Sequence, residues 1–355
     1  MKNQTNSNQW LIDAFSAAVN YTELPSGICF DTKDDGANIQ IRLSARAAAV
    51  KGKNNYSNMQ NDDAAFEGWA LACHCYVPGN TKILLDVNGE IPDWDNVFMK
   101  NGNFAIGHYG RFLYRVLTFY KQFGLDEDWF ELSEDLKRAV KEFEGFLQNG
   151  SFFNNYPSAE GKAEDDGDPE HRVELFFEKE PQKFFEIAER QIPGITGKIH
   201  RQLPCGLFYK EVHTSHTVFA GNKGAMDFWN LSSINDESVM TVVELKTLNK
   251  MIGEITEAWF YGHYCYDVYC RNGLFNKKPG KNKSFRGYEE LKNNEIDKIN
   301  MVMFSDEGNV HPLMADKHIV EMMNKRSAGI TYFLMTYKYK DGQSYERGTY
   351  RKREE

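Results

Sequence analysis

The feature that most constrains this chain is a pair of apolar runs around a short polar segment within residues 224–246. Residues 239–243 are mostly β-branched and apolar, which is typical of a buried strand, and residues 228–231 are predicted to form its partner. Residues 232–238 contain Ser, Asn, Asp and Glu, the composition of a turn. The sequence therefore predicts an antiparallel hairpin in this part of the chain.

The register of this hairpin brings two acidic residues together. A symmetric hairpin centred between Asn235 and Asp236 places Asp227 opposite Glu244. Opposed residues of such a pair have Cβ atoms roughly 4.5–5.5 Å apart, a separation at which like charges repel. Lys246 lies two positions after Glu244 and so projects from the same face of the strand. Two carboxylates this close are stable around a cation, and Mg²⁺ accepts one or two carboxylates plus water and phosphate oxygens.

These residues resemble the motif of the PD-(D/E)XK nuclease superfamily, in which an Asp is followed, after a gap, by an apolar residue, Glu, any residue and Lys. The segment Gly-Ala-Met-Asp ends at Asp227, with Met226 in place of the Pro, and Val-Val-Glu-Leu-Lys ends at Lys246. The resemblance implies that Asp227, Glu244 and the backbone carbonyl of Leu245 bind Mg²⁺ or Mn²⁺. It also implies that Lys246 assists the attacking water.

The same resemblance implies contributions from two helices. Members usually add a carboxylate from a preceding helix, and Glu186 and Glu189 are the candidates here; Glu189 is preferred because it lies nearer the helix end. Members often carry Gln or Tyr on the helix after the lysine. That helix, predicted over residues 249–269, has no Gln, which leaves this part of the match open; its polar side chains include Glu254, Glu257, Tyr261, His263 and Tyr264.

Charge is distributed unevenly along the chain. The net charge of −9 argues against extensive non-specific binding of nucleic acid, which depends on a basic field. Residues 271–286, however, contain six basic residues and no acidic one. A basic loop can contact phosphates, and a solvated loop without such a role is the alternative. The basic residues predicted to contact nucleic acid, preferably DNA, are Lys277, Lys278, Lys281, Lys283 and Arg286.

The helix predicted over residues 249–269 is dense in aromatic side chains. Core packing is the default explanation for such a helix, and stacking on nucleobases is the alternative. Because the basic loop follows directly, Tyr261 is included among the predicted nucleic-acid contacts.

Length and composition predict two domains. A chain of 355 residues is long for one domain, and residues 150–171 are rich in polar residues and Gly, with two prolines. We expect an α+β accessory domain over residues 1–150, a polar linker over 151–171 and a nuclease-like domain over 172–355. The second domain is expected to be α/β, with a mixed central sheet flanked by helices, because its predicted strands and helices follow one another in that order. The resemblance implies the same layout, a restriction-endonuclease-like core.

Periodicity and turn signals predict the remaining elements. Residues 64–75 fit a helix or a strand, and their Ala content favours a helix. Helices are predicted over 8–20, 104–123, 133–148, 181–191 and 316–324, and strands over 28–31, 38–43, 82–87, 173–177, 207–218 (one strand or a pair), 299–304, 310–313 and 330–338.

The sequence predicts a cytoplasmic location. No apolar run approaches the roughly 18 residues of a membrane span, so no membrane partner is expected. Residues 1–9 are polar and lack the apolar segment of a signal peptide. The six cysteines form no Cys-x-x-Cys motif and do not have the spacing of a structural zinc site, and free thiols fit a reducing compartment.

Three functional hypotheses follow. The first is a metal-dependent nuclease acting on DNA or RNA, with residues 1–150 selecting the substrate or binding a protein partner; a role in bacterial antiviral defence or DNA processing rests on analogy with the family. The second is an inactive nuclease-fold subunit that binds nucleic acid or protein. The third is a structural protein with a coincidental motif, because Glu-Leu-Lys recurs at Glu290 to Lys292. Only Glu244 follows an apolar strand with an Asp in register.

Overall fold

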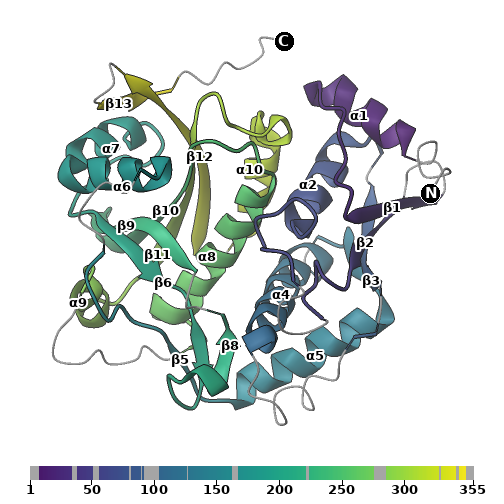
Figure 1. Cartoon of the computed structure of the whole chain (residues 1–355), viewed down its shortest axis with the longest axis horizontal. Coiled ribbons are helices and arrows are strands. Elements are labelled where there is room, and N and C mark those ends of the chain that lie inside the picture. Colours follow the sequence, from purple (N-terminus) through teal and green to yellow (C-terminus); the bar gives the residue numbers. More distant parts are fainter. Residues whose placement is uncertain are drawn as a thin grey trace.

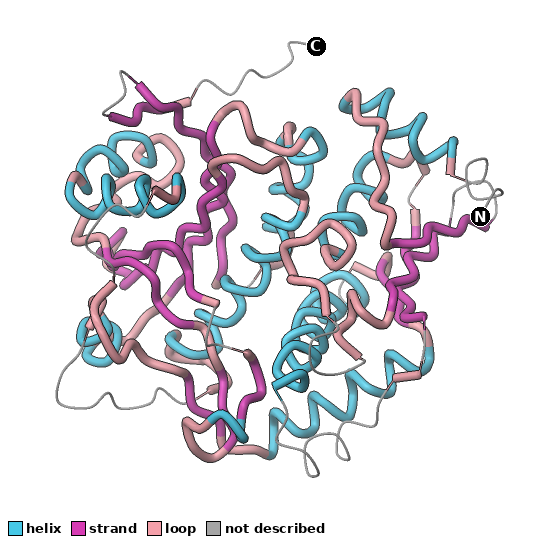
Figure 2. Tube along the Cα trace, in the orientation of Figure 1, coloured by secondary structure: helices cyan, strands magenta, loops and turns pink. Residues whose placement is uncertain are grey.

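The computed structural model describes residues 8–348 apart from short gaps at 34–37, 51–55, 80, 89, 92–103, 126, 162–166, 221–223, 276–284, 328 and 341–343. Figure 1 shows two lobes that correspond to the two halves of the chain, and Figure 2 shows that strands occupy the middle of the C-terminal lobe with helices on both sides. In the described part of the chain, no helix combines the length and apolar character needed to cross a membrane.

The predicted hairpin is confirmed, together with its register. It consists of β9 (Ala225–Ile234) and β10 (Glu237–Lys246), which pair from Ile234 with Glu237 to Phe228 with Val243. The turn is shorter than predicted, because only Asn235 and Asp236 lie between the strands. Both have positive φ angles, 52° and 65°, as a two-residue type I′ turn requires.

The hairpin lies within a six-stranded mixed sheet of order β13-β12-β11-β10-β9-β6. The central strands β10, β11 and β12 are parallel, whereas β6, β9 and β13 are antiparallel to their neighbours. Helix α8 (Gly253–Tyr269) connects β10 to β11, and α10 (Lys317–Asn324) connects β11 to β12. The expected mixed α/β architecture is therefore confirmed. The remaining strands of the sheet are β6 (His200–Pro204), β11 (Lys298–Asp306), β12 (Ile330–Lys340) and β13 (Ser344–Arg347).

The two faces of this sheet are covered by different helices (Figure 1). Helices α6 (Pro169–Lys179) and α7 (Pro181–Ala188) cover one face, where their apolar side chains pack with Val243 and Leu245. The opposite face packs against α8 through residues that include Met240 and Val242. Because side chains alternate along β10, Leu245 points toward α6 and α7, whereas Glu244 and Lys246 point toward α8.

The N-terminal half is α+β. Its sheet has the order β1-β2-β3-β4, and the β2–β3 and β3–β4 pairs are parallel. A separate three-stranded sheet, β5-β7-β8, joins a strand of the 151–171 segment to two strands that follow it. The strands are β1 (Ile28–Lys33), β2 (Asn38–Ser44), β3 (Lys82–Asn88), β4 (Phe130–Leu132), β5 (Phe152–Asn154), β7 (Leu207–Tyr209) and β8 (Thr217–Phe219), and the helices are α1 (Gln9–Val19), α2 (Phe66–Tyr76), α4 (Phe104–Tyr120, continued by a π-helical turn over Lys121–Leu125) and α5 (Glu134–Asn149).

The two halves share one hydrophobic core across α2, α4 and α8. Glu67 is fully buried, forms an ion pair with Arg115 at 2.6 Å and accepts a hydrogen bond from the Thr256 hydroxyl of α8 at 2.9 Å. A Cβ on Gly253 would lie 1.7 Å from the carbonyl oxygen of Gln60, so this contact requires glycine. The domain boundary at residues 151–171 stays a prediction. This segment is not only a linker, because it includes β5, which pairs with β7.

Two predicted strands are wrong. Residues 173–177 belong to helix α6, because Asp168 caps its first turn by accepting from the N–H of Glu170 at 2.9 Å and Pro169 occupies the first helical position. Residues 312–314 form a 3₁₀ turn, since Pro312 lacks the N–H that a strand would use. The structure also decides two predictions that were left open. Residues 64–75 contain helix α2 rather than a strand, and residues 207–218 contain a pair of strands rather than one.

Candidate functional site

The end of β10 carries a buried ion cluster. Glu244 and Lys246 are 4% and 5% exposed and lie on the face that packs against α8. The ammonium of Lys246 donates to Glu244 Oε1 at 2.8 Å and to the backbone carbonyl of Leu245 at 2.9 Å. It also pairs with Glu257 Oε2 of α8 at 3.0 Å. One cation is therefore held between two carboxylates and a carbonyl oxygen.

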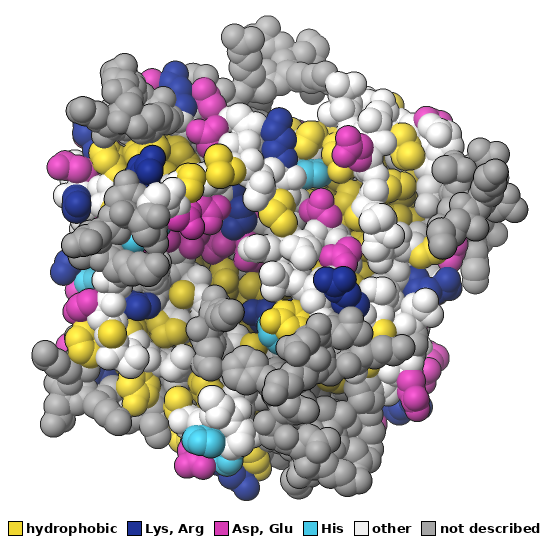
Figure 3. All heavy atoms as spheres, viewed as in Figure 1, with side chains coloured by type: hydrophobic (Ala, Val, Ile, Leu, Met, Phe, Trp, Pro, Cys, Tyr) yellow, Lys and Arg dark blue, Asp and Glu magenta, His cyan; other side chains and the backbone are white. Residues whose placement is uncertain are grey.

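Asp227 joins this cluster from the neighbouring strand. The β9–β10 pairs end at Phe228 and Val243, and beyond them the backbone N–H of Leu245 donates to Asp227 Oδ2 at 2.6 Å. Figure 3 shows acidic side chains beside a basic one on one face of the molecule, whereas Glu244 and Lys246 themselves are buried. Three predicted catalytic residues, Asp227, Glu244 and Lys246, are thus brought together.

The cluster contains more acidic groups than basic ones. Burial, followed by repulsion from Asp227 and Glu257, raises the pKa of Glu244 well above its usual value. Burial also raises the pKa of Asp227, although attraction to Lys246 opposes this shift. Burial alone would lower the pKa of Lys246, but its acidic neighbours raise that pKa well above the usual value. Lys246 therefore remains protonated, and the repulsion between its acidic neighbours would be relieved by a proton or by a second cation.

Helix α8 supplies more of the cluster than its sequence indicated. Glu257 and Tyr261 are four residues apart and lie on one helix face. One turn before Glu257, both carboxylate oxygens of Glu254 accept from the Ser305 hydroxyl at 2.8 Å, and burial raises the pKa of Glu254 to about 7. Tyr261 is only 3% exposed and packs in the core. The structure therefore favours core packing over nucleobase stacking for Tyr261.

The structure does not place Glu189 in this cluster. Glu189 is exposed at the end of α7, where its carboxylate accepts from the N–H of Gly194 at 3.3 and 3.4 Å. An acidic residue that does lie near the cluster on a preceding helix is Glu170, in the first turn of α6. Burial raises the pKa of Glu170, attraction to Lys246 lowers it and repulsion from Glu257 raises it, which places Glu170 beside the cluster.

Glu170 was missed because the sequence assigned residues 151–171 to a linker and 173–177 to a strand. The Asp168–Pro169 pair was an available signal for a helix start. A second signal was the spacing of three acidic residues, Glu170, Glu174 and Glu178, at intervals of four. Residues with this spacing lie on one face of a helix.

The predicted nucleic-acid contacts are only partly described. Lys277, Lys278, Lys281 and Lys283 lie outside the described residues. Arg286 is half-buried and bound to the chain itself. Its guanidinium donates to the Gln202 carbonyl oxygen at 2.7 Å, and its backbone N–H donates to Glu160 at 3.3 Å. These contacts anchor the end of the basic segment against β6.

The cluster contains oxygen atoms of the kind that bind the predicted Mg²⁺ or Mn²⁺. Glu244 Oε2 is buried and, within the described part of the chain, has no hydrogen-bond partner. Carboxylate and carbonyl oxygens are the ligands that Mg²⁺ prefers, and one or two carboxylates suffice. No group of three or more His, Cys, Asp or Glu side chains among the described residues has a metal-binding arrangement. The ammonium of Lys246 contacts Glu244 and the Leu245 carbonyl, two groups that the resemblance assigns to the metal.

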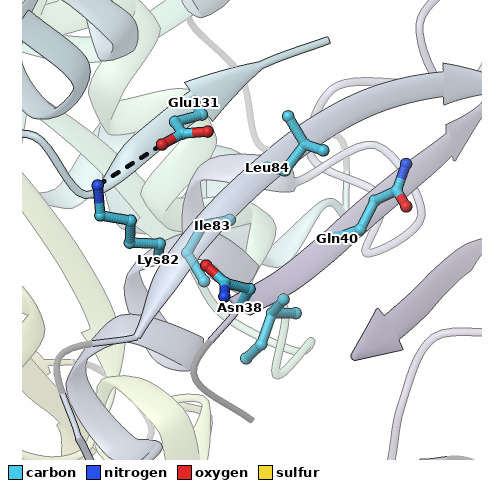
Figure 4. A pocket seen from close by; sticks show the side chains of 7 residues that line it. Asn38, Gln40, Lys82, Ile83, Leu84 and Glu131 are labelled. Carbon is cyan, nitrogen blue, oxygen red and sulfur yellow. Dashed lines mark ion pairs between the residues drawn. The ribbon is translucent and has the colours of Figure 1, made fainter. Parts of the chain in front are cut away.

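A shallow pocket lies elsewhere, across β2, β3 and β4 of the N-terminal half (Figure 4). Its side chains include Asn38, Gln40 and Lys82, and Lys82 pairs with Glu131 at 3.6 Å. None of its residues belongs to the acidic cluster, so it is a separate surface feature.

The cluster at the end of β10 therefore holds a protonated amine among carboxyl and carbonyl oxygens. This arrangement arises from the hairpin register and from the packing of α6 and α8 around the last residues of β10. Comparison with family models, curated proteins and solved structures finds no match for this chain.

Proposed function

We propose that this protein is a metal-dependent nuclease that hydrolyses phosphodiester bonds in DNA or RNA and has a restriction-endonuclease-like core. The observation that carries the proposal is the convergence of Asp227, Glu244 and Lys246 at the end of β10. The mixed sheet with helices on both faces supports it. A cytoplasmic location and a role in bacterial antiviral defence or DNA processing belong to the same proposal.

Each residue has a distinct role in this proposal. Asp227, Glu244 and the Leu245 carbonyl would hold Mg²⁺ or Mn²⁺, which supplies a Lewis acid and lowers the pKa of bound water. Lys246 acts as a hydrogen-bond donor rather than a base, because its acidic neighbours keep it protonated. It orients the attacking water or offsets negative charge that develops on the phosphate. Glu257 holds the amine in place through its ion pair at 3.0 Å.

A second candidate function is an inactive nuclease-fold subunit that binds nucleic acid or a protein partner, the latter through residues 1–150. The observation that favours it is the closure of the cluster. Glu244 and Lys246 are 4% and 5% exposed, and the amine already contacts the oxygens that a metal would use. Catalysis requires Lys246 to move away from Glu244 when a cation binds.

A cleavage assay tests the proposal. The full chain is incubated with plasmid, single-stranded DNA and RNA in the presence of Mg²⁺ or Mn²⁺. Asp227→Asn and Lys246→Met are each expected to lower the rate by about 100- to 10,000-fold. The matched control is Lys292→Met, because Lys292 belongs to a second Glu-Leu-Lys triplet outside the cluster. Thermal unfolding establishes that each variant is folded.

The outcomes separate the candidates. Cleavage that is lost with Asp227→Asn and kept with Lys292→Met supports the nuclease. Equal cleavage by wild type and Asp227→Asn contradicts it, since the activity would come from another site. Tight binding without cleavage of any substrate supports the inactive subunit.

A further inference from the structure

Arg111 of α4 is a buried cation that has no acidic partner among the described residues. It is 8% exposed, and its guanidinium lies over the ring of Phe260 with 5.6 Å between Cζ and the ring centroid. Within the described part of the chain it makes one hydrogen bond, to His108 Nδ1 at 3.1 Å, and no ion pair. Burying an unpaired charge is costly, so folds rarely retain one without another use.

Arg115, one turn later on the same helix, is a buried arginine whose donors are bound within the fold. It donates to both carboxylate oxygens of Glu67, at 2.6 and 2.7 Å, and to the Ala64 carbonyl at 2.8 Å. The two arginines are similarly buried, at 8% and 3% exposed. The fold therefore supplies a carboxylate to Arg115 and leaves most donors of Arg111 available.

Arg111 lies beside the acidic cluster. Phe260, which it covers, is three residues after Glu257 on α8, or about one helical turn. Its Nη1 lies 3.6 Å from the position of a β-carbon on Gly224, three residues before Asp227. Burial lowers the pKa of Arg111, and nearby Glu257 is among the groups that oppose this shift. Arg111 is thus next to both elements that carry the cluster, α8 and β9.

The surroundings of Arg111 hold it in one orientation. Burial, followed by repulsion from Arg111, lowers the pKa of His108 to about 4, so His108 is neutral and its Nδ1 accepts from the guanidinium. The ring of Tyr56 stacks on His108 with centroids 3.6 Å apart. A Cβ on Gly107 would lie 2.8 Å from the backbone nitrogen of Ala220, so α4 approaches the residue after β8 closely at this point.

We propose that Arg111 binds a phosphate oxygen of the nucleic-acid substrate at the candidate active site, which is therefore built from both halves of the chain. This inference rests on the proposed function. A planar guanidinium with free donors matches the geometry of a phosphate, and the acidic cluster beside it binds a cation that attracts the same group. The N-terminal half then contributes directly to catalysis through α4.

Binding and cleavage are measured on the same variants, Arg111→Gln and Arg111→Lys. Arg138→Gln is the matched control, because Arg138 is exposed on α5 and pairs only with Asp135 among the described residues. Binding of fluorescein-labelled single-stranded DNA, duplex DNA and RNA is followed by anisotropy with Ca²⁺ replacing Mg²⁺. Arg111→Gln is expected to weaken binding about tenfold or more, with a partial recovery in Arg111→Lys.

Cleavage adds a readout that a structural role would not change. Arg111→Gln is expected to lower kcat about 100- to 1,000-fold. Sulfur can replace either non-bridging oxygen of the scissile phosphate, which gives two phosphorothioate isomers. We expect the wild type to cleave more slowly the isomer in which sulfur replaces the oxygen bound by Arg111. Arg111→Gln is expected to cleave the two isomers at similar rates, because the contact that distinguishes them is absent.

Four results are distinguishable. Weaker binding and loss of the isomer difference in Arg111→Gln, with Arg138→Gln unchanged, support the phosphate contact. Wild-type cleavage that depends on Asp227 but not on Arg111 overturns this inference and leaves the nuclease in place. Binding that depends on Arg111 without any cleavage keeps the phosphate contact and removes the hydrolysis. Absence of both binding and cleavage in the wild type overturns both proposals.

Discussion

The chain contains the tripeptide Glu-Leu-Lys twice, and the two copies have different surroundings. Glu244 to Lys246 ends the central strand β10, and its Glu and Lys are 4% and 5% exposed. Glu290 to Lys292 lies in the short helix α9 (Tyr288–Asn293), where Glu290 contacts His200 Nε2 at 2.9 Å and Lys292 pairs with Glu289 at 2.7 Å. Only the first copy brings its own Glu and Lys into contact, at 2.8 Å.

Backbone geometry explains this difference. Residues two apart on a strand project from one face, whereas residues two apart on a helix diverge. In both copies the Leu is buried, but in β10 its neighbours point toward α8, where Glu257 completes the cluster. The chemistry of the tripeptide therefore depends on a strand in the middle of a sheet, with a helix packed over its charged face.

The largest expected difference between the copies concerns their lysines. Lys246→Met leaves Glu244 and Glu257 buried without a cation and is expected to lower the free energy of unfolding by about 3–5 kcal/mol. Lys292→Met removes a partly exposed helix pair and is expected to lower it by less than about 1 kcal/mol. Urea unfolding at pH 8 measures both. Equal losses of unfolding free energy in the two variants would show that Lys246 stabilises the fold no more than Lys292 does.

Glu254 extends the comparison to pH. Burial raises its pKa from 4.5 to about 7, so in this range the folded protein binds a proton that the unfolded chain has released. The contribution of Glu254 to stability therefore falls as pH rises from 4.5 through 7, by up to about 3 kcal/mol. Urea unfolding across this range is expected to show a smaller decline in Glu254→Gln than in wild type.

The matched control for this pH series is Glu186→Gln, because Glu186 is exposed on α7 and pairs with Lys183, so that Glu254 stays in place and the wild-type decline is kept. If the free energy of unfolding of Glu254→Gln falls with pH as much as that of the wild type, groups other than Glu254 cause the decline. Glu174 is the first of these to test, because burial raises its pKa to about 7 as well.

Asp227→Asn is expected to have a smaller effect of opposite sign. The fold raises the pKa of Asp227, so its charged form is disfavoured and its neutral replacement should raise the free energy of unfolding by about 1 kcal/mol at pH 8. The amide oxygen of Asn can still accept from the N–H of Leu245. The same variant is expected to lose cleavage, so activity and stability move in opposite directions. A less stable variant would indicate that the carboxylate form of this hydrogen bond outweighs the repulsion.

The sequence was sufficient to predict the hairpin, its register and the meeting of Asp227, Glu244 and Lys246. These features depend on local alternation and on a period of two, which a single sequence carries. The mixed sheet flanked by helices also followed from the order of the elements. The turn was predicted too long, because Ser232 and Ser238 have turn-like side chains but lie within the paired strands.

The parts of the site that come from other elements were not predicted. Glu170, Glu257 and Arg111 reach the cluster through the packing of α6, α8 and α4, and nothing in their spacing encodes that convergence. Glu189 was preferred for its position along a helix, but α7 directs it toward Gly194. Tyr261 was considered for stacking because its helix is dense in aromatic residues, but these side chains pack against both the N-terminal half and the sheet, as Trp259 does with Phe119 and Tyr332.

The smallest expected effect concerns the turn that sets the register of the first copy. Asp236 has a φ angle of 65°, a conformation that costs most side chains energy and glycine little. Asp236→Gly produces the Asn-Gly sequence that type I′ turns favour and should raise the free energy of unfolding by about 0.5–1 kcal/mol. Urea unfolding measures the gain, and unchanged cleavage shows that the register is kept. A loss of both stability and cleavage would mean that the Asp236 side chain, rather than the turn geometry, maintains the register that places Asp227 near Glu244.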